Sequence, residues 1–99
     1  MAFESKSKSE ETDRLFQAVL ALDTLDECYR FFEDVCTINE IKSIAQRLEV
    51  ARLLRDGKTF SVIAEKTGAS TTTIARVNRS LQYGAGGYDI VMGDKKKAD

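Results

Sequence analysis

Apolar residues in this chain recur mainly three or four positions apart, the spacing that places them on one face of an α-helix. The clearest stripe consists of Ile41, Ile44, Ala45, Leu48 and Ala51. Thr37, followed three residues later by Glu40, forms a capping box in which each side chain satisfies a free backbone amide. Gly57 is placed to end the helix. The pattern therefore predicts a long helix over residues 38–56.

Two shorter helices are predicted before it. Ser9 can cap a helix whose acidic first turn complements the helix dipole. Thr24 and Glu27 form another capping box, and the segment that follows is apolar over a wide arc. Such helices need neighbours on more than one side, and a short chain buries little surface by itself. We therefore expect a second copy to supply some of these neighbours; a monomeric helical bundle is the alternative.

Residues 60–82 fit a helix-turn-helix unit. Ala64 offers a small side chain where the two helices approach each other, and Gly68 supplies the backbone freedom that the turn needs. Ser70 can cap the second helix. Three aliphatic residues at helical spacing would bury that helix against the first: Ile74, Val77 and Leu81.

The opposite face of this second helix carries groups that bind nucleic acid. Hydroxyls, amides and guanidiniums bond base edges and phosphates in the major groove, and no acidic residue occurs between Lys66 and Tyr83. A polar, solvated helix face is the alternative interpretation. The residues expected to contact DNA are Thr71, Thr72, Thr73, Arg76, Asn78 and Arg79, with Lys58 and Lys66 near the ends of the first helix.

Charge is divided unequally along the chain, although the formal net charge is only -1. Residues 1–40 carry four bases and ten acids, whereas residues 41–99 carry eleven bases and six acids. A basic half favours a polyanionic partner. The pI near 5.5 lies below the range typical of nucleic-acid-binding domains, so charge alone does not decide.

Composition argues against most enzyme chemistry. The chain has no histidine, which removes Ser-His and Cys-His nucleophile pairs and imidazole metal ligands. We therefore expect no catalytic activity, no metal site and no cofactor. Cys28 and Cys36, about 12 Å apart if they share one helix, are too distant for a disulfide and fit a reducing compartment.

The ends of the chain are expected to differ from its body. Residues 1–8 are polar and are expected to be flexible, ahead of a helical domain over residues 9–83. They contain no secretory signal, and no apolar run approaches the roughly 20 residues of a membrane span, so a cytoplasmic protein without a membrane partner is expected. Glycines at 84, 86 and 87 indicate a flexible tail over residues 84–99. Docking of residues 88–92 on the body is the alternative, and Lys95 to Lys97 could approach DNA phosphate.

The stretch from Thr37 to Leu81 resembles the Trp repressor family, and within it the YerC/YecD-type branch. The resemblance rests on Gln46-Arg47-Leu48, Leu53-Leu54, Gly57, Gly68-Ala69-Ser70 and Thr73-Ile74-Ala75-Arg76. It implies an all-α, intertwined homodimer that presents two helix-turn-helix units to a palindromic operator in double-stranded DNA. The implied function is sequence-specific transcription regulation, as a repressor that occupies promoters. A protein-interaction module on the same scaffold, without DNA selectivity, is the alternative.

The resemblance also raises the question of an effector. The family's namesake binds L-tryptophan between two arginines, which fall on Arg47 and Arg76 here, while a threonine near the ligand falls on Thr37; the match at Arg47 needs a one-residue gap. The glycine that should follow the second arginine is Val77, whose branched side chain would occupy the ligand's space. L-Tryptophan is therefore not expected, whereas a small anionic effector at these three positions stays open.

Overall fold

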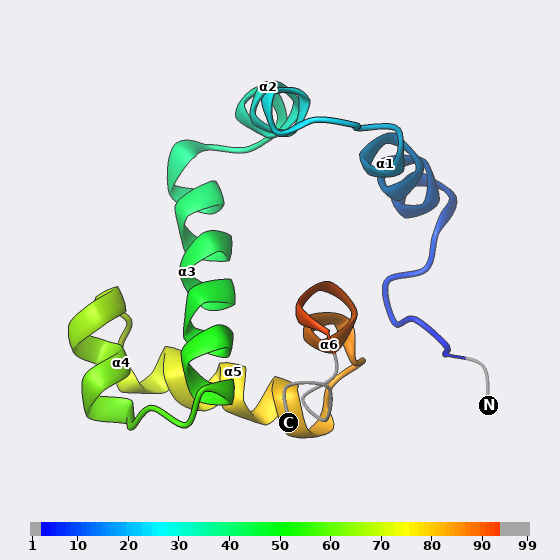
Figure 1. Ribbon diagram of the computed structural model, residues 1–99. Helices are drawn as coiled ribbons and strands as arrows, with labels where there is room; N and C mark the ends of the chain where they lie inside the picture. The colour runs from blue at the N-terminus through cyan, green and yellow to red at the C-terminus, as the bar shows by residue number, and fades with distance from the viewer. Residues whose placement is uncertain (1–2, 94–99) are drawn as a thin grey trace. The chain divides into compact units, whose positions relative to one another are not determined.

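The computed structural model describes residues 3–93, which contain six helices and no strand (Figure 1). The helices are α1 (Glu10–Leu20), α2 (Leu25–Val35), α3 (Ile38–Arg55), α4 (Phe60–Thr67), α5 (Thr71–Tyr83) and α6 (Gly87–Met92). The predicted all-α class is thus confirmed. Within the described part of the chain, no helix is long and apolar enough to cross a bilayer. The chain divides into two units, one ending at Ile41 and the other beginning at Lys42.

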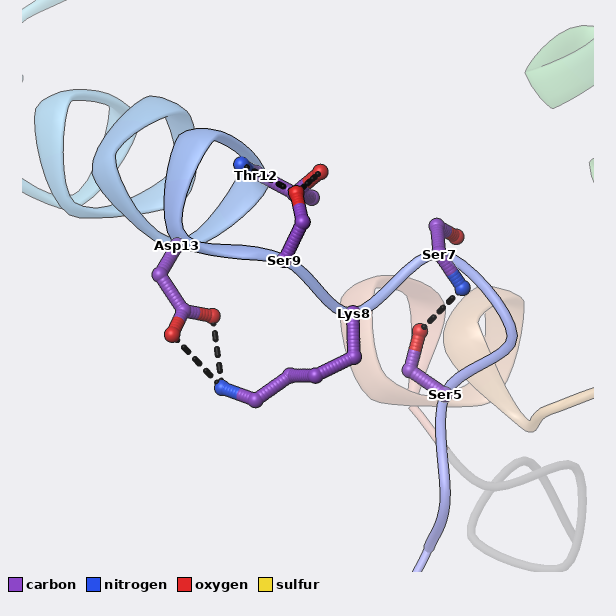
Figure 2. Close-up of polar contacts among 6 residues, drawn as sticks. All are labelled: Ser5, Ser7, Lys8, Ser9, Thr12 and Asp13. Atoms are coloured by element: carbon purple, nitrogen blue, oxygen red, sulfur yellow. Dashed lines mark hydrogen bonds and ion pairs between the residues drawn. The ribbon is translucent and has the colours of Figure 1, made fainter.

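The first unit begins α1 at the cap predicted from sequence. The backbone N–H of Thr12 donates to Ser9 Oγ at 3.0 Å, and Lys8 Nζ lies 2.7 Å from both carboxylate oxygens of Asp13 (Figure 2). The acidic first turn places negative charge where the helix dipole is positive. The start of α1 therefore follows directly from its local sequence.

The two predicted capping boxes differ in the structure. At α3 the box is reciprocal: Glu40 N–H donates to Thr37 Oγ1 at 3.1 Å, and Thr37 N–H donates to Glu40 Oε1 at 2.7 Å. At α2 the Glu27 N–H donates to Thr24 Oγ1. The Glu27 carboxylate, however, accepts the backbone N–H of Asp23, the residue before Thr24, instead of that of Thr24 itself. Only the capping box at α3 therefore has the predicted form in full.

Many large apolar side chains of the first unit are exposed. Neither α1 nor α2 contains a buried residue. Cys28 and Cys36 are half-buried free thiols. The exposed large apolar residues on these helices and at the start of α3 are Leu15, Phe16, Leu20, Leu25, Tyr29, Val35 and Ile38. An apolar surface of this extent is typical of an interface.

The end of α3 is a Schellman motif. Gly57 adopts φ +81°, a conformation that favours glycine. Its N–H donates to the Leu54 carbonyl at 3.0 Å, and the Lys58 N–H donates to the Leu53 carbonyl at 3.1 Å. The helix thus ends at Arg55, as the position of Gly57 predicts within one residue.

The ion pairs of Arg52, in the last turns of α3, are local. Arg52 pairs with Glu49 and, at 3.8 Å, with Asp56. The hydrogen bond to Glu49, together with the negative charge of that carboxylate and of Asp56, raises the pKa of Arg52 above its ordinary value. Both partners lie within four residues of Arg52, so these pairs connect α3 to no other helix.

The second unit holds the hydrophobic core. In Figure 1, α4 and α5 surround the C-terminal end of α3. The buried core residues are Val50, Ala51 and Leu53 of α3, Ile63 of α4, Ala69 of the turn, and Ile74 and Val77 of α5. Leu54, Ala64, Leu81, Tyr88 and Met92 pack at its margin. The predicted burial of Ile74 and Val77 is confirmed, and Leu81 is half-buried beside them.

The chain after α5 differs from the flexible segment predicted there. It forms α6, which follows Gly86 at φ +83°. Tyr88 and Met92 lie four residues apart and pack against the core, because this spacing places both side chains on one face of a helix. The glycine-rich composition predicts flexibility, whereas these contacts agree with the alternative, docking of residues 88–92 on the body. The lysines at 95–97 lie outside the described residues.

Candidate nucleic-acid interface

Helices α4 and α5 form the predicted helix-turn-helix unit. Thr59 Oγ1 accepts the Val62 N–H at 3.2 Å at the start of α4. Gly68, at φ +75°, ends α4 in the left-handed conformation. Ser70 Oγ then accepts the Thr73 N–H at 3.1 Å and begins α5. The end of α4 and the start of α5 are therefore set by the glycine and the cap that the sequence predicts there.

The turn between the two helices is held by one threonine. Thr67 Oγ1 donates to the Ile63 carbonyl at 2.7 Å and accepts the Ala69 N–H at 3.1 Å. Gln46 Nε2, from α3, donates to the Thr67 carbonyl at 3.1 Å. Neither residue is predicted from sequence to hold this turn. For Gln46 the reason is that a contact between positions 21 residues apart leaves no trace in local periodicity.

The solvent-facing side of α5 carries most of the expected DNA contacts. Thr71, Thr72, Arg76 and Arg79 are exposed there, opposite the buried face of the helix. Among the described residues, no ion pair engages Arg76 or Arg79. Both guanidiniums thus keep their donors available. Two exposed lysines accompany them, Lys58 after α3 and Lys66 on α4.

Two of the expected contacts lie elsewhere on α5. Thr73 is half-buried, and its hydroxyl is hydrogen-bonded to Ser70 Oγ at 3.1 Å. Asn78 is also half-buried and lines a small cavity beside Arg55 and Asp89. Asn78 lies four residues after the buried Ile74, which places it on the flank of the buried face.

The three candidate effector residues are not brought to one cavity of the second unit. Arg47 is exposed, donates to Ser43 Oγ at 2.8 Å, and borders an open cavity of about 450 Å³. Arg76 is not among the residues that line this cavity. Thr37 belongs to the first unit, where its hydroxyl caps α3. The cavity lining is otherwise mainly apolar or glycine.

These features define an all-helical protein in which the second helix of the helix-turn-helix unit, α5, has an exposed, acid-free outer face. The family model described as Trp repressor protein matches residues 10–96, and the chain belongs to the Trp repressor family.

Individual relatives are similar over nearly the whole chain. The "uncharacterized protein YerC" of Bacillus subtilis (strain 168) is 53% identical over 94 residues, which cover 95% of this chain and 90% of the relative. The crystal structure of a TrpR like protein from Eubacterium eligens ATCC 27750 matches with a TM-score of 0.85 and 63% identity, covering 88% of this chain and 90% of that one. A crystal structure from Staphylococcus aureus matches with a TM-score of 0.84 and 47% identity, covering 88% of this chain and 87% of that one.

Proposed function

We propose that this protein is a sequence-specific DNA-binding transcription regulator that represses promoters by occupying them as a homodimer. The observation that supports this most directly is the two-sided character of α5. Ile74 and Val77 are 0% and 2% exposed and fix the helix to the body, while Arg76 and Arg79 face solvent without an ion pair among the described residues. Membership of the Trp repressor family agrees with this role.

The contacts follow from the position of each group on α5. In helix-turn-helix proteins the N-terminal residues of the second helix contact base edges in the major groove. Thr71 and Thr72 occupy this end. Arg76 and Arg79 follow along the same face, where guanidiniums bind guanine edges or phosphates. Lys58 and Lys66 would contact the DNA phosphate backbone. Thr73 and Asn78 would make secondary DNA contacts, because both side chains are half-buried.

The homodimer is proposed because the first unit exposes its apolar side chains. Neither α1 nor α2 buries a residue within the described chain, and a second copy would cover both. Two α5 helices related by a two-fold axis would enter successive major grooves of a palindromic operator, about 34 Å apart. The protein would act in the cytoplasm.

Tryptophan does not act as the effector in this proposal. Val77 is part of the buried core at the position that carries a glycine in the namesake. Arg47 and Arg76 would then serve the dimer, the DNA or another small anion.

The test is the selection of bound sequences from a random duplex pool, followed by gel shifts with the selected duplex. We expect the R76A/R79A variant to lose specific binding while keeping its circular dichroism spectrum, because both guanidiniums lie on the solvent side of α5. The matched control is K6A/K8A, which removes the same charge from two exposed lysines that precede α1.

Two outcomes contradict the proposal. Retention of the specific shift by R76A/R79A refutes the assignment of these arginines. Failure of the wild-type protein to select any duplex at low salt refutes sequence-specific DNA binding and favours a protein-interaction module on the same scaffold.

A further inference from the structure

Two long-range side-chain hydrogen bonds of the second unit start on α3. Gln46 Nε2 donates to the Thr67 carbonyl at 3.1 Å, and Arg55 Nη1 donates to Asp89 Oδ1 at 3.3 Å. Every other side-chain hydrogen bond between described residues joins positions at most five apart. These two links are therefore distinctive, and they lie near opposite ends of α5.

The first link lies beside the N-terminal end of α5. The Thr67 carbonyl belongs to the last turn of α4, where carbonyls lack a partner within the helix. Gln46 supplies that partner from α3. The Thr67 hydroxyl in turn accepts the N–H of Ala69, which immediately precedes the α5 cap Ser70. Gln46 thus connects α3 to the turn from which α5 begins.

The second link lies beyond the C-terminal end of α5. The Arg55 side chain is only 15% exposed, and its partner Asp89 lies on α6. The pair borders a cavity of about 230 Å³ that is also lined by Asn78, Leu81 and Gln82 of α5. Because Tyr88 and Met92 pack on the core, the ion pair and the packing together hold α6 beside the last turns of α5.

We propose that Gln46 and Arg55 are positioning residues that fix the direction of α5 relative to α3 and thereby its selectivity for base sequence. This inference rests on the proposed function. A helix of 13 residues is about 20 Å long, so a tilt of about 10° about one end displaces the other by about 3 Å. That displacement exceeds the tolerance of a bidentate hydrogen bond to a base edge, whereas non-specific binding depends on phosphate charge and survives it.

The experiment measures the ratio of the affinities for the selected duplex and for a random duplex, well below each variant's melting temperature. A role in stability alone does not change this ratio while the protein is folded. Q46M keeps the length of the side chain but removes its donor. R55E and D89R each place like charges opposite each other, and R55E/D89R restores the pair with the wild-type net charge. R52E is the matched control, because it makes the same charge change on α3 at ion pairs that stay within that helix and its end.

We expect Q46M, R55E and D89R each to lower the selectivity ratio about tenfold, the scale of one hydrogen bond. The R55E/D89R variant should recover most of this loss, and R52E should change both affinities together. An unchanged ratio in Q46M and R55E, or no recovery in R55E/D89R, would overturn the inference.

One further variant covers the case in which a charge reversal fails to fold. D89N removes the charge from a half-exposed side chain and should lower the ratio in the same direction. A wild-type protein that selects no duplex refutes the proposed function, and with it this inference. If the wild-type protein selects a duplex and Q46M and D89N both keep the wild-type selectivity ratio, the inference is refuted and the proposed function stands.

Discussion

Three consecutive threonines begin α5, and their environments differ. Thr71 and Thr72 are exposed, whereas Thr73 is half-buried and hydrogen-bonded to Ser70 Oγ. The third residue of a helix donates its N–H to the capping side chain, which also brings its own hydroxyl close to that cap. Local sequence therefore contains the information that separates Thr73 from its two neighbours, although residue type alone does not.

Thr72 and Thr73 should respond differently to removal of the hydroxyl. We expect Thr72→Val to weaken binding to the selected duplex about threefold to tenfold, the scale of one lost hydrogen bond, without changing the melting temperature. Thr73→Val should instead lower stability by about 0.5–1 kcal/mol and leave affinity within about twofold of wild type. Gel shifts and thermal melts of both variants check this, and the reverse pattern would place Thr73 against DNA.

Other residues of the site depend on contacts that sequence does not encode locally. The burial of Ile74 and Val77 follows from their helical spacing, and the structure confirms it. The partner of Gln46 is 21 residues away and is determined by how α3 meets the turn. Asn78 likewise borders a cavity that is also lined by Arg55 of α3 and Asp89 of α6, a grouping that local sequence does not encode.

Helix ends are the most predictable features at the level of elements. Ser9, Thr37, Gly57, Gly68 and Ser70 each end or begin a helix at the position inferred from sequence. These signals are local, since a cap acts on amides two or three residues away. The helix α6 is not predicted from sequence because its stability depends on the core contacts of Tyr88 and Met92.

Two glycines at helix ends should respond in opposite directions to alanine. Gly57 has φ +81° and open space where a methyl group would project, so Gly57→Ala should cost about 1–2 kcal/mol from backbone strain alone. Gly87, the first residue of α6, has no positive φ and also has open space, so Gly87→Ala should be neutral or stabilising by up to about 1 kcal/mol. Denaturant unfolding measures both values. A neutral Gly57→Ala would show that this helix end relaxes.

The exposed apolar surface of α1 and α2 is the main feature at the level of the whole molecule. The sequence pattern predicts that these helices need neighbours from a second copy, and within the described residues of this single chain they contain no fully buried residue. In the proposed dimer the identity of those neighbours is an intermolecular property, which periodicity along one chain indicates but does not specify.

We expect the wild-type protein to sediment at twice the chain mass of 11.0 kDa. Leu20 on α1 is 83% exposed, and Leu20→Glu should shift the equilibrium toward monomer because burying a carboxylate is costly. Gln17→Glu, which adds the same charge at a polar, exposed position of α1, should leave the dimer intact. Sedimentation velocity distinguishes these cases, and a monomeric wild type would contradict the dimer.

Because α1 and α2 contain no buried residue, the behaviour of the chain should change with its concentration. In the proposed dimer, association and the ordering of these two helices occur together, so mass action couples folded stability to the number of chains present. At low concentration the chains would then leave promoters unoccupied. As the concentration of the chain rises, the fraction of promoters bound by the dimer would increase more than in proportion to it.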